Sequence, residues 1–242
     1  MPWPLVSLGL LLVAWALVAM VMQSDLLPGP GAVWQAFERE WRLGYMADMG
    51  ATLGRVAAAF ALAMTLGSAL GIWLGMTPGA DRLLWSWVIF FLNVPALVTI
   101  VLCYVWFGLT ETAAVTAVAI NKIPNVAATL REGARALSTD LDEMARVYRL
   151  PRRDRLRHVV LPQLAPFFAA AARGGLALVW KIVLVVELLG RPNGVGFEIH
   201  SQFQLFDVAG ILAYALGFIL VVQAIEWLVL APWERATRRW RR

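Results

Sequence analysis

The sequence predicts an all-α integral membrane protein with six transmembrane helices, on three observations. Of 242 residues, 60% are hydrophobic and 15% are charged, a balance too apolar for a soluble chain with one buried core. Apolar runs recur along the chain, and each is about long enough to cross a hydrocarbon core of roughly 30 Å as a helix. The basic residues gather in two clusters that are separated by two such runs.

Six segments are expected to cross the membrane. Four contain uncharged runs, and two are weaker because charged residues such as Lys122 and Lys181 interrupt them. The predicted spans are residues 5–23, 51–77, 83–108, 110–130, 163–189 and 207–230, all within one transmembrane domain over residues 1–242. No positive segment precedes the first run and no small-residue cleavage site follows it, so we expect a retained helix.

The basic clusters predict the orientation. Nine basic residues lie from Lys122 to Arg157, and five more close the chain: Arg235, Arg238, Arg239, Arg241 and Arg242. Such clusters favour the cytoplasmic side of a membrane. Counting back through six spans places both termini in the cytoplasm. Because topology explains these arginines and no aromatic residues interleave with them, we expect no nucleic-acid partner.

Proline and glycine residues punctuate the chain. The segment LLPGPG is expected to break the chain before a short interfacial helix from Ala32 to Trp41. In the second span Gly67, Gly71 and Gly75 recur every four residues. Their repeat predicts a helix face without side chains, against which another helix can pack closely.

Polar residues inside the spans are candidates for a translocation path. Pro95 should kink or break the third span beside Asn93, which indicates either a path through the membrane or a structural kink. Burying Lys181 in the fifth span costs roughly 3 kcal/mol, so it either attracts an anionic solute or pairs with an acid on another helix. Glu187, six residues later, lies on a different face of the predicted helix. Near the span ends, Arg55, Lys122, Arg173 and Glu226 are expected to extend toward the membrane surface.

Cysteine and histidine usage excludes several classes of site. The chain has one cysteine, Cys103, and two histidines, His158 and His200, which cannot build a zinc site or a disulfide framework. The histidines fall in predicted loops, so they do not fit an intramembrane serine protease. We expect no metal site and no catalytic residues. An ion-coupled secondary carrier remains the alternative function, although the chain has no repeated halves of the kind common in carriers.

The polar loop over residues 131–162 is predicted to form two short helices. Asp140 can cap the first, with Glu143 three residues later completing a capping box. Pro151 suits the first turn of a second helix from Arg152 to His158. Such a block either docks a partner or packs only on its own membrane domain.

This loop resembles the cytoplasmic signature of binding-protein-dependent ABC importer permeases, which reads Glu-Ala-Ala, three residues, Gly, nine residues, Ile-x-Leu-Pro. The residues at the signature positions, with every interval kept, are Glu143, Met144, Ala145, Arg149, Val159, Leu161 and Pro162. Met144 replaces an alanine, and Arg149 replaces the glycine, so Pro151 is expected to shape the turn. The outer segment LLPGPGAVWQAF and Glu187 followed by RPNGVGF are similar to the nitrate, sulfonate and taurine type.

The resemblance implies a type I ABC importer permease in a bacterial inner membrane. It implies a homodimer that receives a small solute, of the nitrate, sulfonate, taurine or related organic acid class, from a periplasmic binding protein. The chain has no G-x-x-x-x-G-K-[ST] motif, so ATP and Mg are assigned to a separate ATPase subunit. The residues expected to dock that ATPase are Glu143, Met144, Ala145, Arg149, Leu150, Pro151, Leu161 and Pro162.

Overall fold

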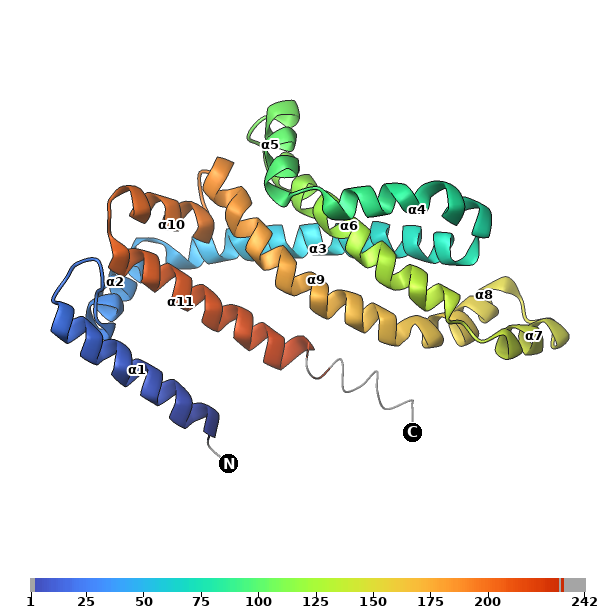
Figure 1. Cartoon of the computed structure of the whole chain (residues 1–242), viewed down its shortest axis with the longest axis horizontal. Helices are drawn as coiled ribbons and strands as arrows, with labels where there is room; N and C mark the ends of the chain where they lie inside the picture. Colours follow the sequence, from blue (N-terminus) through green and yellow to red (C-terminus); the bar gives the residue numbers. More distant parts are fainter. Residues whose placement is uncertain (1–2, 231, 233–242) are drawn as a thin grey trace. The chain divides into compact units, whose positions relative to one another are not determined.

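The computed structural model describes residues 3–230 and 232, and this part of the chain contains helices and no strand. The C-terminal basic cluster from Arg235 lies outside the described residues. In chain order (Figure 1) the elements are α1 (Trp3–Met22), α2 (Pro30–Leu43), α3 (Tyr45–Met76), α4 (Pro78–Asn93), α5 (Ala96–Phe107), α6 (Glu111–Arg135), α7 (Thr139–Val147), α8 (Arg152–Arg155), the π-helical segment η1 (Leu156–Val160), α9 (Leu161–Gly190), α10 (Val195–Gln204), α11 (Val208–Ile225) and a second π-helical segment η2 (Glu226–Leu230). The all-α prediction is confirmed.

Several of these helices are long and apolar enough to cross a membrane. Among the described residues, four qualify singly: Tyr45–Met76, Glu111–Arg135, Arg153–Gly190 and Val208–Leu228. The bent pair α4 and α5 makes a fifth if it is counted as one span, and Val6–Met22 is a shorter apolar helix. These segments overlap the expected spans, while the count of six crossings stays a prediction.

The break predicted at Pro95 separates α4 from α5. The two helices are bent by 95°, with Pro95 as the residue that precedes α5. Proline has no amide hydrogen and its ring clashes with the preceding turn, so the α4 ladder cannot continue through it. At the end of α4, Asn93 Nδ2 donates to the Ile89 carbonyl at 2.8 Å. The predicted kink is confirmed.

The chain forms two compact units that share α3 and α9. Unit 1 contains the residues up to Leu53 and Glu187–Ala224, and unit 2 contains Gly54–Val186 and the residues from Ile225. The boundary therefore falls inside each of the two long helices.

In unit 2, the glycine face of α3 packs directly on the backbone of α6. A Cβ added at Gly71 would lie 2.4 Å from the Ala127 carbonyl oxygen, and one at Gly75 would lie 2.6 Å from the Arg131 carbonyl oxygen. Since side chains at these positions would hold the helices apart, the glycine repeat sets the distance between α3 and α6. This confirms the predicted packing face.

In unit 1, α2 and α11 pack through an apolar cluster, and an ion pair joins α2 to the residue that precedes α11. Val33 and Ala36 of α2 form a buried cluster with Ala213 of α11. Arg39 Nη2 contacts Asp207 Oδ2 at 2.6 Å. The hydrogen bond to Asp207 raises the pKa of Arg39 above its ordinary value. The helix expected over residues 32–41 is thus confirmed as α2, whereas α10 lies between the predicted spans 163–189 and 207–230, where no helix was expected.

Candidate functional site

The first candidate site is the loop between α6 and α9. Its first helix, α7, begins after Ser138, whose hydroxyl accepts a hydrogen bond from the Leu141 amide. The prediction that Asp140 caps this helix is therefore wrong. Serine is as good an N-cap residue as aspartate, and α7 begins two residues earlier than the predicted capping box requires.

The end of α7 explains the residue at the signature's glycine position. Arg149 adopts the left-handed conformation with φ of 51°. Its amide donates to the Arg146 carbonyl at 3.0 Å, and the Leu150 amide donates to the Ala145 carbonyl at 2.9 Å. This is the Schellman pattern that closes many helices, and glycine is its preferred left-handed residue. Arg149 is therefore the left-handed residue of the turn that joins α7 to α8. The expectation that Pro151 shapes this turn is wrong.

Replacing Arg149 with glycine is expected to stabilise the protein by about 1 kcal/mol, because glycine adopts positive φ without the clash of a Cβ. The measurement is the thermal midpoint of the purified protein in detergent. The matched control is Arg153→Gly: Arg153 is also exposed but lies in helical α8, so the same change is expected to lower the midpoint. A lower midpoint for Arg149→Gly would contradict this account of the joint.

The second helix of the loop does not end at His158, as expected from the sequence. α8 continues into η1 and then α9, so that Arg153–Gly190 is one helical segment. In η1 the Leu161 amide donates to the Leu156 carbonyl, five residues back. The following residue, Pro162, has no amide hydrogen, and a local π-helical turn accommodates such a break in the ladder without ending the helix. The loop's second half is therefore a continuous helical extension of α9.

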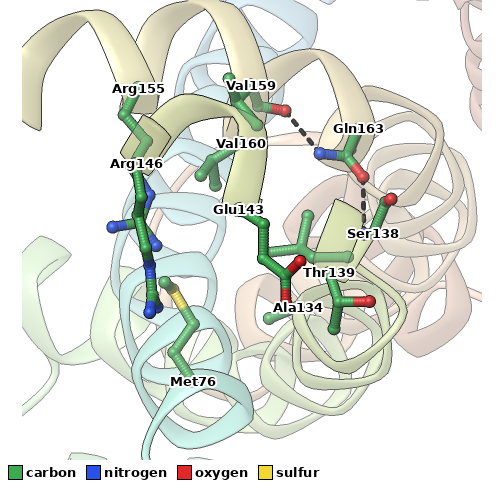
Figure 2. A pocket seen from close by; sticks show the side chains of 11 residues that line it. Met76, Ala134, Ser138, Thr139, Glu143, Arg146, Arg155, Val159, Val160 and Gln163 are labelled. Atoms are coloured by element: carbon green, nitrogen blue, oxygen red, sulfur yellow. Dashed lines mark hydrogen bonds between the residues drawn. The ribbon is translucent and has the colours of Figure 1, made fainter. Parts of the chain in front are cut away.

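A pocket of about 280 Å³ in unit 2 is lined by residues of α7, η1 and α9. Figure 2 shows Arg146 of α7 and Gln163 of α9 at opposite sides, with Glu143 of α7 between them. Gln163 ties the two halves of the loop together, because its Oε1 accepts from the Ser138 amide at 2.9 Å while its Nε2 donates to the Val159 carbonyl at 2.9 Å. Sequence reasoning missed Gln163, which differs from its neighbours only in being polar after a proline.

Most of the residues predicted to dock the ATPase are on the surface. The exposed ones are Glu143, Met144, Arg149, Leu150, Pro151, Leu161 and Pro162. Ala145 is the exception, with 1% exposure, so it packs α7 inward and offers no surface. Val147 and Tyr148, with 78% and 75% exposure, extend the apolar part of this surface beyond the predicted residues.

A buried ionic cluster anchors α6 where it approaches the loop. Asp81 of α4 contacts Arg131 through both of its carboxylate oxygens and Arg135 at 2.5 Å. The Arg131 guanidinium also lies 3.7 Å from the centre of the Trp85 ring. Asp81 and Arg131 are 6% and 5% exposed. This cluster fixes the end of α6 against α4 just before the chain enters α7.

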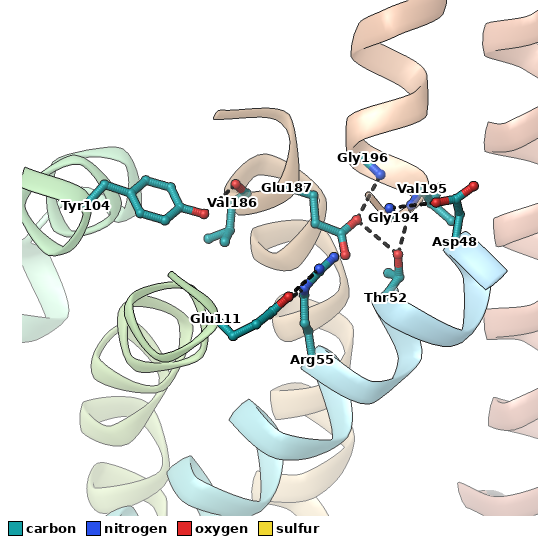
Figure 3. A network of polar contacts seen from close by, with 10 residues as sticks. All are labelled: Asp48, Thr52, Arg55, Tyr104, Glu111, Val186, Glu187, Gly194, Val195 and Gly196. Atoms are coloured by element: carbon teal, nitrogen blue, oxygen red, sulfur yellow. Dashed lines mark hydrogen bonds and ion pairs between the residues drawn. The ribbon is translucent and has the colours of Figure 1, made fainter. Parts of the chain in front are cut away.

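The second candidate site is the turn after α9 in unit 1. Glu187, with no exposed surface, accepts from the Thr52 hydroxyl at 3.0 Å and from the Gly196 amide at 2.8 Å (Figure 3). The Val195 amide donates to Thr52 Oγ1 at 2.9 Å. A buried carboxylate that accepts several hydrogen bonds holds its partners in one arrangement. Glu187 and Thr52 therefore position the start of α10.

Two residues expected near span ends are buried in unit 2. Arg55 is 5% exposed and makes a two-pronged contact with Glu111 at 2.9 and 2.7 Å (Figure 3). Lys122 is 4% exposed and lies in the middle of α6. The expectation that they extend toward the membrane surface is wrong for both, since Arg55 meets a carboxylate 56 residues away in sequence and Lys122 packs inside the bundle.

The other predicted path residues are exposed and scattered. Asn93 and Pro95 lie at the break between α4 and α5, and Lys181 lies on the exposed face of α9. Lys181 makes no hydrogen bond or ion pair with the described part of the chain. The structure does not bring Lys181 and Glu187 together. Their shared role in a translocation path stays a prediction. The described residues contain no group of three or more His, Cys, Asp or Glu that could hold a metal ion.

Comparisons with known proteins agree on one family. The family described as "Binding-protein-dependent transport system inner membrane component" matches residues 67–231. The chain is 29% identical to SsuC of Escherichia coli, named as an aliphatic sulfonates transport permease, over 89% of this chain and 84% of that one. It is 27% identical to the taurine transport system permease TauC of the same species, over 77% and 70%. The bicarbonate transport system permease CmpB of Synechococcus elongatus is 26% identical, over 74% and 66%.

Solved structures show the same fold. An amino acid ABC transporter crystallised with histidines superposes with a TM-score of 0.66 at 20% identity, covering 82% of this chain and 96% of that one. The MetNI methionine ABC transporter in an inward-facing conformation has a TM-score of 0.63 at 19% identity, covering 78% and 92%. This chain therefore shares its fold with these two ABC transporter chains.

Proposed function

Because the chain belongs to the family of binding-protein-dependent transport system inner membrane components, we propose that it forms the passage through which an ATP-driven importer moves a small anion into the cytoplasm. As the permease subunit it is a transport component, and a separate ATPase hydrolyses ATP. The observation that carries this proposal is the α7 joint, where Arg149 takes the left-handed conformation at the position of the signature's glycine.

The exposed face of α7 is the proposed contact with the ATPase, which binds ATP and Mg. Three features support this assignment. Met144, Val147 and Tyr148 present apolar surface to solvent, the Schellman turn stiffens the helix end, and Gln163 fastens the loop to α9. Apolar anchors on a rigid element are typical of protein interfaces.

We propose that two copies of the chain dimerise in a bacterial inner membrane, with both termini in the cytoplasm.

Movement of α7 is proposed to reach the membrane through its two neighbouring helices. Only three residues separate the end of α6 from the start of α7, and the end of α6 is held by the Asp81 cluster. On the other side, α8 and η1 continue into α9 without a break. Closure of two ATPase subunits would therefore move α7, and α6 and α9 would tilt with it as rigid bodies.

The solute is proposed to be an anion of the sulfonate, taurine, nitrate or bicarbonate class, received from a periplasmic binding protein. The names of three relatives support this, since aliphatic sulfonates, taurine and bicarbonate each carry an anionic oxygen group. Asn93, Pro95 and Lys181 are proposed to line the passage, and Glu187 to hold the outer turn closed. Lys181 would attract the anion, which its exposed side chain permits.

Transport by the reconstituted complex tests the proposal. The chain should co-purify with an ATPase, and proteoliposomes containing both subunits and the binding protein should take up labelled taurine, ethanesulfonate or bicarbonate when ATP is supplied. Uptake driven by a proton or sodium gradient without any ATPase would favour the alternative, an ion-coupled secondary carrier.

Reversing the charge of Glu143 is expected to release the ATPase. Glu143 is exposed on α7 and borders the pocket behind it, so Glu143→Lys places a cation where the docked subunit would meet a carboxylate. We expect at least a ten-fold loss of co-purified ATPase, or about 1.4 kcal/mol of binding free energy. The matched control is Asp140→Lys, because Asp140 is exposed on the same helix but is not a predicted docking residue. Equal retention of the ATPase by both variants would contradict the proposed interface.

A further inference from the structure

A lysine near the middle of α6 is buried inside unit 2, and no described residue gives it a counter-charge. Lys122 is 4% exposed. It follows Glu111, the first residue of α6, by eleven positions and precedes Arg135, the last, by thirteen. At 1.5 Å per residue it is about 16 and 20 Å from the two helix ends, so it lies far along the helix from either end. Within the described part of the chain, Lys122 makes no hydrogen bond or ion pair.

The surrounding helices have no free carboxylate to offer it. On α3 to α6 and on α9 up to Val186, the acidic residues of unit 2 are Asp81, Glu111 and Glu132. Asp81 contacts Arg131 and Arg135, Glu111 contacts Arg55, and Glu132 contacts Arg131. Each carboxylate is already matched to an arginine. A buried ammonium without a partner is strongly unfavourable, so the charge of Lys122 calls for an anion from outside the chain.

The fold keeps space for this ammonium. Gly175 of α9 lies against the end of the lysine side chain: a Cβ added there would be 2.8 Å from Lys122 Cε and 3.6 Å from Nζ. Any larger residue would clash with Lys122 Cε, the carbon that carries the ammonium group. The preceding residue, Gly174, has no atom within 4 Å of an added Cβ. The close approach is therefore specific to the glycine beside Lys122.

A polar stripe on α6 continues from this position. At 100° per residue, Asn121, Asn125, Thr129 and Lys122 fall within a sector of about 100°. The two asparagines donate to carbonyls four residues back, at 3.1 and 3.4 Å. Each amide group has two N–H donors, and one remains after this bond. An ammonium beside spare amide donors is a suitable environment for the oxygens of a carboxylate, carbonate or sulfonate.

We propose that the Lys122 ammonium, at the centre of α6, binds the anionic group of the transported solute during its passage. This inference rests on the proposed function and identifies a group that holds the charge. In this structure the site is closed around the lysine. Because α6 leads directly to α7 and Gly175 lies on α9, tilting of these helices by the ATPase would open and close the site. Alternating access would thus expose the anion-binding lysine to one side of the membrane at a time.

Thermal stability of the purified chain in detergent tests the binding directly. Ethanesulfonate is the charged probe, and ethyl methyl sulfone is its uncharged counterpart. We expect ethanesulfonate, taurine or bicarbonate to raise the thermal midpoint of the wild type, the sulfone to leave it unchanged, and Lys122→Met to abolish the anion effect. Without anion, Lys122→Met should unfold at the wild-type temperature or higher, because methionine needs no counter-ion. Lys122→Arg keeps the charge and should keep the response.

ATP-driven uptake in proteoliposomes is the second readout. Lys122→Met is expected to lower the initial uptake rate about ten- to a hundred-fold, the range set by losing one hydrogen bond to a charged group, with normal co-purification of the ATPase. Gly175→Ala should lower uptake because its Cβ displaces the lysine, whereas Gly174→Ala should not. Both alanines change helix propensity equally, so a difference between them reports the side-chain contacts at position 175, where Lys122 Cε at 2.8 Å is nearer than Phe60 Cε2 at 3.4 Å.

The outcomes separate this inference from the function on which it rests. If ATP-driven uptake occurs in the wild type and is unchanged in Lys122→Met, the proposed role of Lys122 is wrong and the importer function stands. If none of the three anions stabilises the wild type, the role is likewise overturned. If the anions stabilise the wild type through Lys122 but uptake needs an ion gradient and no ATPase, the lysine site stands and the importer function is wrong.

Discussion

Replacing Asp81 with asparagine is expected to destabilise the permease by about 3–5 kcal/mol, the range found when one partner of a buried ion pair is removed. Asp81 is 6% exposed and faces two cations. It contacts Arg131 through both carboxylate oxygens and Arg135 at 2.5 Å. Asparagine has nearly the same shape but no charge, so Arg131 would stay buried with Glu132 as its one carboxylate partner among the described residues. The measurement is the free energy of unfolding in mixed micelles.

A double-mutant cycle separates this pair from a general loss of packing. Arg131→Met in the Asp81→Asn background removes the uncompensated charge, so the double variant should be more stable than Asp81→Asn alone. Glu132→Ala is the matched control, because its carboxylate contacts the same arginine but is 61% exposed; its effect should stay below about 1 kcal/mol. Strictly additive losses would show that the Asp81 and Arg131 charges do not stabilise each other.

Gly71→Ala is the second substitution with a large expected effect. The new Cβ would lie 2.4 Å from the Ala127 carbonyl oxygen and 2.9 Å from its Cα. Both atoms belong to the backbone of α6, so no side chain can turn aside and the helices must separate. Overpacking of this kind costs about 1–3 kcal/mol. It would also weaken ATP-driven uptake, because α6 links the membrane domain to α7.

The control for this substitution is on the same helix. Gly54→Ala places a Cβ where no atom lies within 4 Å, so it should be neutral or slightly stabilising, since alanine favours a helix more than glycine does. The difference in thermal midpoint between Gly71→Ala and Gly54→Ala measures the packing of α3 on α6. Equal midpoints would mean that the glycine repeat does not set the helix separation.

The sequence predicted those parts of the fold that depend on local pattern. Apolar runs mark long helices wherever the bilayer is the solvent. Glycines every four residues share one helix face, and Pro95 cannot continue a helix ladder because it lacks an amide hydrogen. Spacing alone also identified the α7 loop, because the signature intervals are counted along the chain. The physical role of Arg149 was missed, since a positive φ in a residue other than glycine is not visible in composition.

The sequence by itself determined the membrane class, the helices, the break at Pro95 and the family signature, because each follows from neighbouring residues or fixed intervals. Only the tertiary structure decided which charges meet. Asp81 and Arg131 are 50 residues apart, and Arg55 and Glu111 are 56 apart. Among the described residues, it also left Lys122 without a carboxylate partner. Hydrophobic patterns place helices in a membrane without specifying their partners, and the pairing of buried charges depends on which helix faces pack together.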